Sequence, residues 1–209
     1  MDGSEFRERV RETNKTELNR LGSEKALVAT TNATLDRETV LERAAAAELR
    51  AAETFEQWAA DEENDRAREA FTEAAKRERE HYEQVCELGD TEASEPDEDS
   101  LHSYLREHEQ AVDRVAAGLV ARPLVASRTL LQVINFFVNE AETATADRFR
   151  EIRSDTDDQA KDGADLLAEI CDEEDWEQAE RVAGEAIEEA YREYADTLEG
   201  MGLDPKPVC

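Results

Sequence analysis

Apolar residues recur at spacings of three and four along most of the chain, which is the period of α-helices that bury one face. Strict alternation of apolar and polar residues, the pattern of strands, does not extend over any long segment. The pattern therefore predicts an all-α fold, a bundle of four long helices with additional N-terminal and connector helices. Long helices are expected at about 36–62, 65–88, 123–153 and 174–200, and shorter ones at 100–118 and 156–171.

Three segments are expected around and within this bundle. Residues 1–35 have weak periodicity and a break near Gly22, so they predict a helical arm over a bundle that spans 36–200. Residues 89–99 combine Gly and Pro with a run of acidic residues, which is typical of a solvated loop. The tail at 201–209 contains two prolines and cannot continue the last helix. A length of 209 residues suits one domain.

The charge of the chain limits its partners. The 54 acidic and 25 basic residues give a formal net charge of −29, which would repel a nucleic acid. Self-repulsion of this size also opposes a compact fold unless dense counterions screen it. Only five of the basic residues are Lys, a composition that resembles proteins of salt-accumulating archaea. We therefore expect a halophilic, acidic protein.

Neither export nor a membrane location is expected. The charged N-terminus lacks the apolar segment of a signal peptide, so the sequence predicts a cytoplasmic protein. The most apolar stretch, 119–138, includes Arg122 and Arg128, which favours a buried helix over a membrane span. The three cysteines are odd in number and form no CxxC pair, which indicates reduced thiols and excludes a recognisable zinc or rubredoxin-type iron centre.

Three ionisable residues fall on the apolar faces of the first two long helices. Glu48 lies four residues after Ala44 and three before Ala51, and Glu78 and His81 continue the apolar rhythm of the next helix. Ionised carboxylates in a core need a compensating charge or a shared proton, and a divalent metal would provide it. The Glu-x-x-His spacing sets an oxygen and a nitrogen ligand one helical turn apart, within reach of one ion.

Further carboxylates complete the candidate set. Glu140 follows the apolar face of the expected 123–153 helix, which makes it a candidate for a bridging ligand. On the 174–200 helix, Glu180 lies inside the apolar face, whereas Glu188 lies at its edge but nearer mid-height, and the choice between them stays open. The candidate metal ligands are Glu48, Glu78, His81, Glu140, Glu180 and Glu188.

This arrangement of Glu and Glu-x-x-His resembles the ferritin-like superfamily, particularly its rubrerythrin-like branch, over roughly 36–200. Proteins of this type hold two irons between the helices of a four-helix bundle. The resemblance implies one or two ions of iron or manganese, with dioxygen or peroxide as substrate of a rubrerythrin-like oxidoreductase. Glu48, Glu78, His81 and Glu140 match the pattern, but Thr143 stands where a second Glu-x-x-His would need its histidine.

The missing histidine leaves a second hypothesis from a different class. A degenerate, metal-free bundle would have a structural, regulatory or partner-binding role, with the apolar surface of the helix at 124–153 as a homodimer interface. In that case Glu78 and His81 would form a hydrogen bond with each other, or a salt bridge with a core-facing arginine such as Arg128 or Arg148. His102, in contrast, is predicted to be exposed.

Overall fold

The computed structural model describes residues 1–89 and 99–206, so most of the predicted loop at 89–99 and the last three residues of the tail lie outside the described residues. Within the described ranges all regular structure is helical, as predicted. In chain order the helices are α1 (Gly3–Thr13), α2 (Lys15–Leu21), α3 (Lys25–Thr30), α4 (Arg37–Asp61), α5 (Asp65–Gly89), α6 (Ser100–Arg106), α7 (Ala111–Arg114), the π-helix η1 (Val115–Ala121), α8 (Arg122–Asn139), α9 (Thr143–Ile170) and α10 (Asp175–Gly200).

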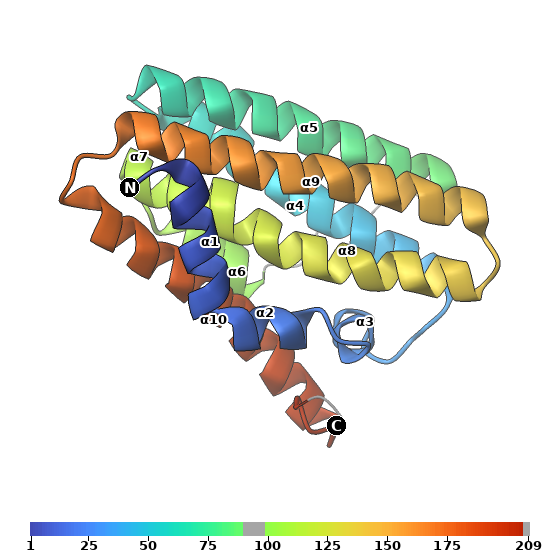
Figure 1. Cartoon of the computed structure of the whole chain (residues 1–209). Helices are drawn as coiled ribbons and strands as arrows, with labels where there is room; N and C mark the ends of the chain where they lie inside the picture. Colours follow the sequence, from blue (N-terminus) through green and yellow to red (C-terminus); the bar gives the residue numbers. More distant parts are fainter. Residues whose placement is uncertain (90–98, 207–209) are drawn as a thin grey trace.

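Four long helices, α4, α5, α8 and α9, run alongside one another and form the bundle (Figure 1). α4 packs along α5, and α8 packs along α9, so the bundle consists of two helical hairpins. Asp36 caps α4 by accepting a hydrogen bond from the backbone N–H of Thr39, which is the N-cap geometry. The predicted helices at 36–62, 65–88 and 174–200 are confirmed.

The expected helix at 123–153 is wrong, because the chain turns at 140–142. Ala141 has a φ of 59°, and the backbone N–H of Glu142 donates to the carbonyl of Phe137 at 2.9 Å. These features form a Schellman motif, which usually has Gly at the left-handed position. With Ala in that position, the sequence contains no Gly or Pro signal for the break. α9 therefore starts at Thr143 and absorbs the separate helix expected at 156–171.

α9 is consequently the fourth helix of the bundle, and α10 is not. α10 crosses beneath the bundle, where it contacts η1, α6 and the arm helices (Figure 1). The arm itself belongs to the core: Phe6 and Leu18 are buried, and the ring of Phe6 lies 5.6 Å from that of Trp176. α1 lies so close to α9 that a Cβ on Gly3 would come within 2.3 Å of the carbonyl oxygen of Ala164.

The apolar core has two parts. One part contains the packed rings of Phe55, Trp58 and Phe71, and the other contains the stacked rings of Phe137 and Phe149. The two parts occupy opposite halves of the bundle helices, and the buried acidic residues Glu48 of α4 and Glu78 of α5 lie between the halves. A polar belt thus divides the interior of the bundle.

The central helical stretch is held in place by close backbone contacts. A Cβ on Gly118 of η1 would lie 2.4 Å from Cζ3 of Trp58, and one on Gly163 of α9 would lie 2.5 Å from the carbonyl oxygen of Leu119. By length and composition Ala111–Asn139 could cross a membrane, but 72% of its most apolar window is buried in this fold. This stretch is therefore mostly buried inside the bundle, as predicted for the apolar segment 119–138.

Candidate metal centre

Glu48, Glu78 and His81 meet in the polar belt. Glu48 is 5% exposed, and Glu78 and His81 are each 1% exposed. Each residue offers one ligand atom, and these atoms lie within 4.8 Å of one another. α4 supplies the first residue and α5 the other two, as the helical periodicity predicts. This cluster of two carboxylates and an imidazole could hold a metal ion.

The imidazole of His81 is fixed at one nitrogen and unpartnered at the other. Its Nε2 lies 3.3 Å from Oδ2 of Asp155 on α9, and since an ionised carboxylate only accepts, Nε2 donates the proton. Its Nδ1 has no hydrogen-bond partner within the described residues, although Oε2 of Glu48 and Oε2 of Glu78 lie 3.8 and 3.9 Å away. A lone pair facing two carboxylates is repulsive, so a proton or a cation belongs between them.

Arg122 at the start of α8 is the cationic neighbour of this cluster. Its Nη1 donates to Oε1 of Glu78 at 2.6 Å and its Nη2 to Oε2 at 3.2 Å, a bidentate pair. Its Nη2 lies 4.0 Å from Oε2 of Glu48, and its guanidinium lies over the ring of Phe55 at 5.7 Å. Arg122 therefore already compensates one of the two carboxylates.

Arg122 was not among the candidate residues from the sequence. The hypothesis of a core-facing arginine named Arg128, which is half-buried, and Arg148, which is exposed and pairs with Glu151. A signal was nevertheless present, because Arg122 follows seven consecutive buried apolar or glycine residues. A charge inside such a run needs an internal partner.

A second polar group adjoins the centre. Nδ1 of His102 lies 2.9 Å from Oδ1 of Asp99, and Nε of Arg50 lies 2.8 Å from Oδ2 of the same carboxylate. The predicted exposure of His102 is wrong: Asp99 caps α6 and thereby holds His102 inside, at 5% exposed. Burial lowers the pKa of His102, which keeps it neutral.

The charges of the centre shift one another's pKa values. Burial and the charge of Glu78 raise the pKa of Glu48 to about 7. Burial opposes the protonation of His81, but the nearby carboxylates of Glu48 and Glu78 outweigh it and raise the pKa of His81 to about 10. Burial likewise opposes the ionisation of Glu78, but the charge of Arg122 lowers its pKa well below the usual range.

The other predicted ligands do not join the cluster. Glu140 is exposed at the C-terminal end of α8, because the helix ends there instead of continuing to 153. Glu180 accepts a hydrogen bond from Arg9 at 3.0 Å, and Glu188 is exposed beside Arg192. Both belong to α10, which lies outside the bundle, so their helix cannot bring them to the centre.

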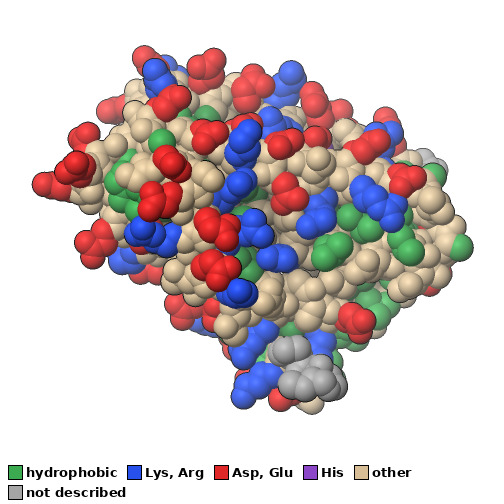
Figure 2. Space-filling view, viewed as in Figure 1, with side chains coloured by type: hydrophobic (Ala, Val, Ile, Leu, Met, Phe, Trp, Pro, Cys, Tyr) green, Lys and Arg blue, Asp and Glu red, His purple; other side chains and the backbone are tan. Residues whose placement is uncertain are grey.

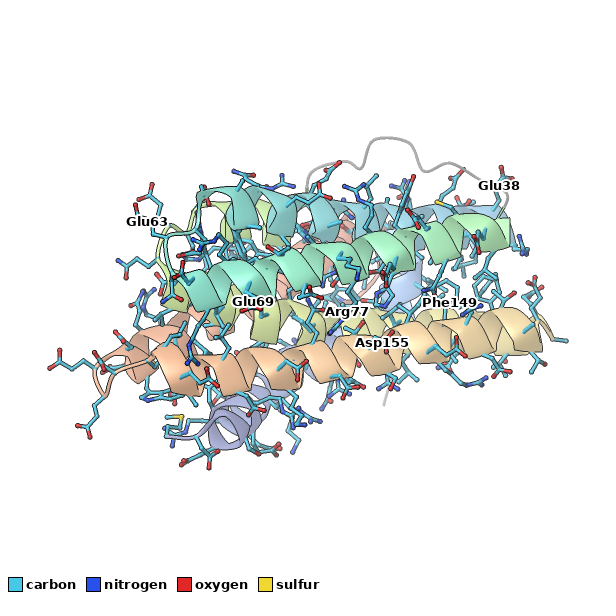
Figure 3. All side chains as sticks on the ribbon, turned by 90° about the horizontal axis from the view of Figure 1, so that it is seen from above. Glu38, Glu63, Glu69, Arg77, Phe149 and Asp155 are labelled. Carbon is cyan, nitrogen blue, oxygen red and sulfur yellow. The ribbon has the colours of Figure 1, made fainter. Side chains whose placement is uncertain are left out.

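A groove of about 550 Å³ between α5 and α9 leads from the surface to this centre. It is lined by His81 and Asp155 and, nearer the solvent, by Arg77 and Lys161. Figure 3 shows Arg77 and Asp155 on the two facing helices. The side chain of Asp155 is 56% exposed, so it connects the buried imidazole with the solvent.

The fold and the site together define an all-helical bundle with a buried carboxylate and histidine cluster. The chain matches no protein-family model, no curated protein and no solved structure. The ferritin-like resemblance therefore stays a prediction, and the residues of the site are the basis for any function of this chain.

Proposed function

We propose that this chain binds one divalent metal ion, iron or manganese, through Glu48, Glu78 and His81. The observation that carries the proposal is the orientation of His81. Its Nε2 is fixed by Asp155, and its unpartnered Nδ1 faces two carboxylate oxygens. Metal-ligating histidines commonly donate their other ring N–H to a carboxylate in this way, which fixes the tautomer and the direction of the ligating nitrogen.

The ligand types favour these two metals. Carboxylate oxygens suit manganese, imidazole nitrogen suits iron, and the centre contains no thiolate that would select a softer ion among the described residues. The charge of Arg122 offsets one carboxylate, so a divalent ion displacing the proton of His81 would leave the belt with a small net charge. Three protein ligands also leave coordination positions for dioxygen or peroxide, the substrates that the ferritin-like resemblance implies.

A second candidate function follows from Arg122. Three carboxylates, Glu48, Glu78 and Asp99, face three cationic side chains, His81, Arg122 and Arg50. This balance supports a metal-free bundle in which the charged belt has a structural role. Buried charge networks of this kind can fix one arrangement of helices, even where they add little to stability.

Metal analysis separates the two candidates. The protein is purified in high salt without chelators, and metal content and Mn²⁺ binding by calorimetry are compared for wild type, Glu48→Gln and His81→Ala. We expect one ion per chain in the wild type and its loss in both variants. Glu188→Gln, on the exposed face of α10, is the matched control and keeps the ion. A wild type without stoichiometric metal, or ion content unchanged in both variants, would leave the metal-free bundle.

A further inference from the structure

Gln159 on α9 is buried without any hydrogen-bond partner. Its side chain is 3% exposed, and neither Oε1 nor Nε2 has a partner in the part of the chain that the structure describes. A primary amide can donate two hydrogen bonds and accept two, and leaving all of them unmade inside a protein is unfavourable. Such a group indicates that something absent from the protein chain occupies the space beside it.

Contacts on either side of α9 place Gln159 at the height of the centre. Gly163 packs directly against Leu119, so Gln159, one turn earlier, is level with Arg122 on the neighbouring stretch. α5 and α9 run in opposite directions, because Arg66 at the start of α5 pairs with Glu169 near the end of α9, whereas His81 further along α5 contacts a residue earlier in α9. Because Asp155 contacts His81, Gln159, one turn later, is level with Glu78.

The direction of the side chain follows from the same contacts. Asp155 faces α5 and Gly163 faces η1, and Gln159 lies midway between them in the sequence. At about 100° per residue, positions four apart lie on nearly the same side of a helix, each rotated slightly further. Gln159 therefore projects between α5 and α8, toward the paired side chains of Glu78 and Arg122.

We infer that Gln159 is a fourth ligand of the metal centre and supplies its amide oxygen to the ion. The inference rests on the proposed function, since it needs an ion beside Glu78. An amide oxygen adds a ligand without adding negative charge, which suits a belt whose carboxylates are already compensated by Arg122. Carbonyl oxygen also favours manganese over zinc, so Gln159 sets the metal preference of the centre.

The test compares Mn²⁺ and Zn²⁺ affinities of the metal-free full-length protein with those of Gln159→Leu. We expect Mn²⁺ affinity to fall by about 10- to 100-fold, the range found for supporting residues of metal sites, and Zn²⁺ affinity to fall less. In the same variant the unfolding midpoint of the metal-free protein is expected to stay equal or rise, because an unpartnered buried polar group has been removed. Gln159→Asn, which keeps the amide but shortens its reach, should lose Mn²⁺ affinity as well.

Gln132→Leu is the matched control. Gln132 is also buried in a bundle helix, but its Nε2 donates to the carbonyl of Gly22 at 2.6 Å. Its replacement should lower the unfolding midpoint and leave Mn²⁺ affinity unchanged. Wild-type Mn²⁺ affinity in both Gln159 variants would overturn the inference and leave the three-residue site intact. A wild type that binds no Mn²⁺ would overturn both proposals.

Discussion

At the scale of single residues, Arg122 donates two hydrogen bonds to the carboxylate of Glu78, and both side chains are almost completely buried. Both charges lose their hydration in the folded state, so the pair adds little to stability compared with apolar side chains of the same volume. Removing only one partner is a different matter, because the remaining charge has neither water nor a counterion. Replacing only one partner of the pair therefore tests whether Glu78 depends on Arg122.

Arg122→Met should destabilise the metal-free protein by about 3–5 kcal/mol, because it leaves the carboxylate of Glu78 buried and uncompensated. The measurement is urea unfolding at pH 7 and constant salt. Arg148→Met, at an exposed position, is the control and should change stability by no more than about 0.5 kcal/mol. Equal stability of the two variants would show that Glu78 does not depend on Arg122.

The pKa values of the centre predict how the stability of the metal-free protein changes with pH. The pKa of His81 rises from 6.5 to about 10 on folding, so its contribution is complete below pH 6.5 and is lost as pH rises through 10. The pKa of Glu48 rises from 4.5 to about 7, so the fold also loses stability as pH rises across that interval. Both shifts have the same sign.

We therefore expect the free energy of unfolding of the metal-free protein to fall between pH 6.5 and 10, and His81→Gln to remove most of that slope. Mn²⁺ affinity should increase over the same range, because the ion displaces the proton on Nδ1. Urea unfolding and calorimetry at fixed ionic strength measure the two quantities. A wild-type slope retained in His81→Gln would assign the titration to another group.

Some side chains of the centre are placed by the periodicity of their helix and others by tertiary packing. Only the first kind could be predicted from the sequence. Glu48, Glu78 and His81 follow from helical periodicity, because regular helices fix the faces on which they lie. Asp155 and His102 depend on where a helix begins and on which helix faces it, and those features are set by tertiary packing. Gln159 directly follows the polar and acidic run at 154–158, so the sequence around it favours an exposed position.

At the scale of the elements, helix limits set by local sequence signals could be predicted, whereas those set by tertiary contacts could not. Helices with an ordinary N-cap or a charged connection, such as α4 and α5, agree with their predicted limits to within about one residue. The turn between α8 and α9 could not be predicted, because Ala141 adopts a left-handed conformation that Ala disfavours. Hydrogen bonds across the turn and the packing of α8 against α9 outweigh that preference.

Two helical glycines make the contact between α9 and η1 testable. Gly163→Ala should destabilise the fold by about 1–3 kcal/mol, because the new Cβ would meet the backbone of Leu119 and force the helices apart. Gly184→Ala, in α10, meets nothing closer than 3.5 Å and should instead stabilise by about 0.5–1 kcal/mol through the higher helix propensity of Ala. Thermal unfolding of both variants measures these two changes of stability. Two changes of the same sign would contradict the close contact.

At the scale of the whole molecule, the chain carries a net charge of −29, and on the face shown in Figure 2 acidic side chains are interspersed with Lys and Arg. Most of the ion pairs at the surface are exposed and contribute little individually. Long-range repulsion between the excess carboxylates therefore opposes the fold in dilute buffer.

The unfolding midpoint should accordingly rise with salt from 0.05 M to several molar, most steeply at the low end of the range where screening changes most (about 0.05 to 0.2 M). Thermal unfolding in KCl measures the effect. A variant with several exposed α10 carboxylates changed to Gln should need less salt for the same midpoint. A midpoint independent of salt would show that local ion pairs, and not the net charge, control stability.

Self-association through 124–153 stays a prediction. Most apolar residues of α8 pack inside the bundle, whereas Val138 is 48% exposed near its end. An interface built on this helix would therefore involve the end next to the 140–142 turn and not its whole length.

The π-helix that precedes α8 has a consequence for how relatives of this chain would diverge. A π-helix fits more residues into each turn than an α-helix, so seven residues of it change the rotational phase of everything that follows. The loss of a single residue between 115 and 121 would keep the segment apolar and helical, yet would turn the guanidinium at position 122 away from the carboxylate on α5. In any lineage that keeps this centre, the length of that segment should thus be more strictly preserved than its individual side chains.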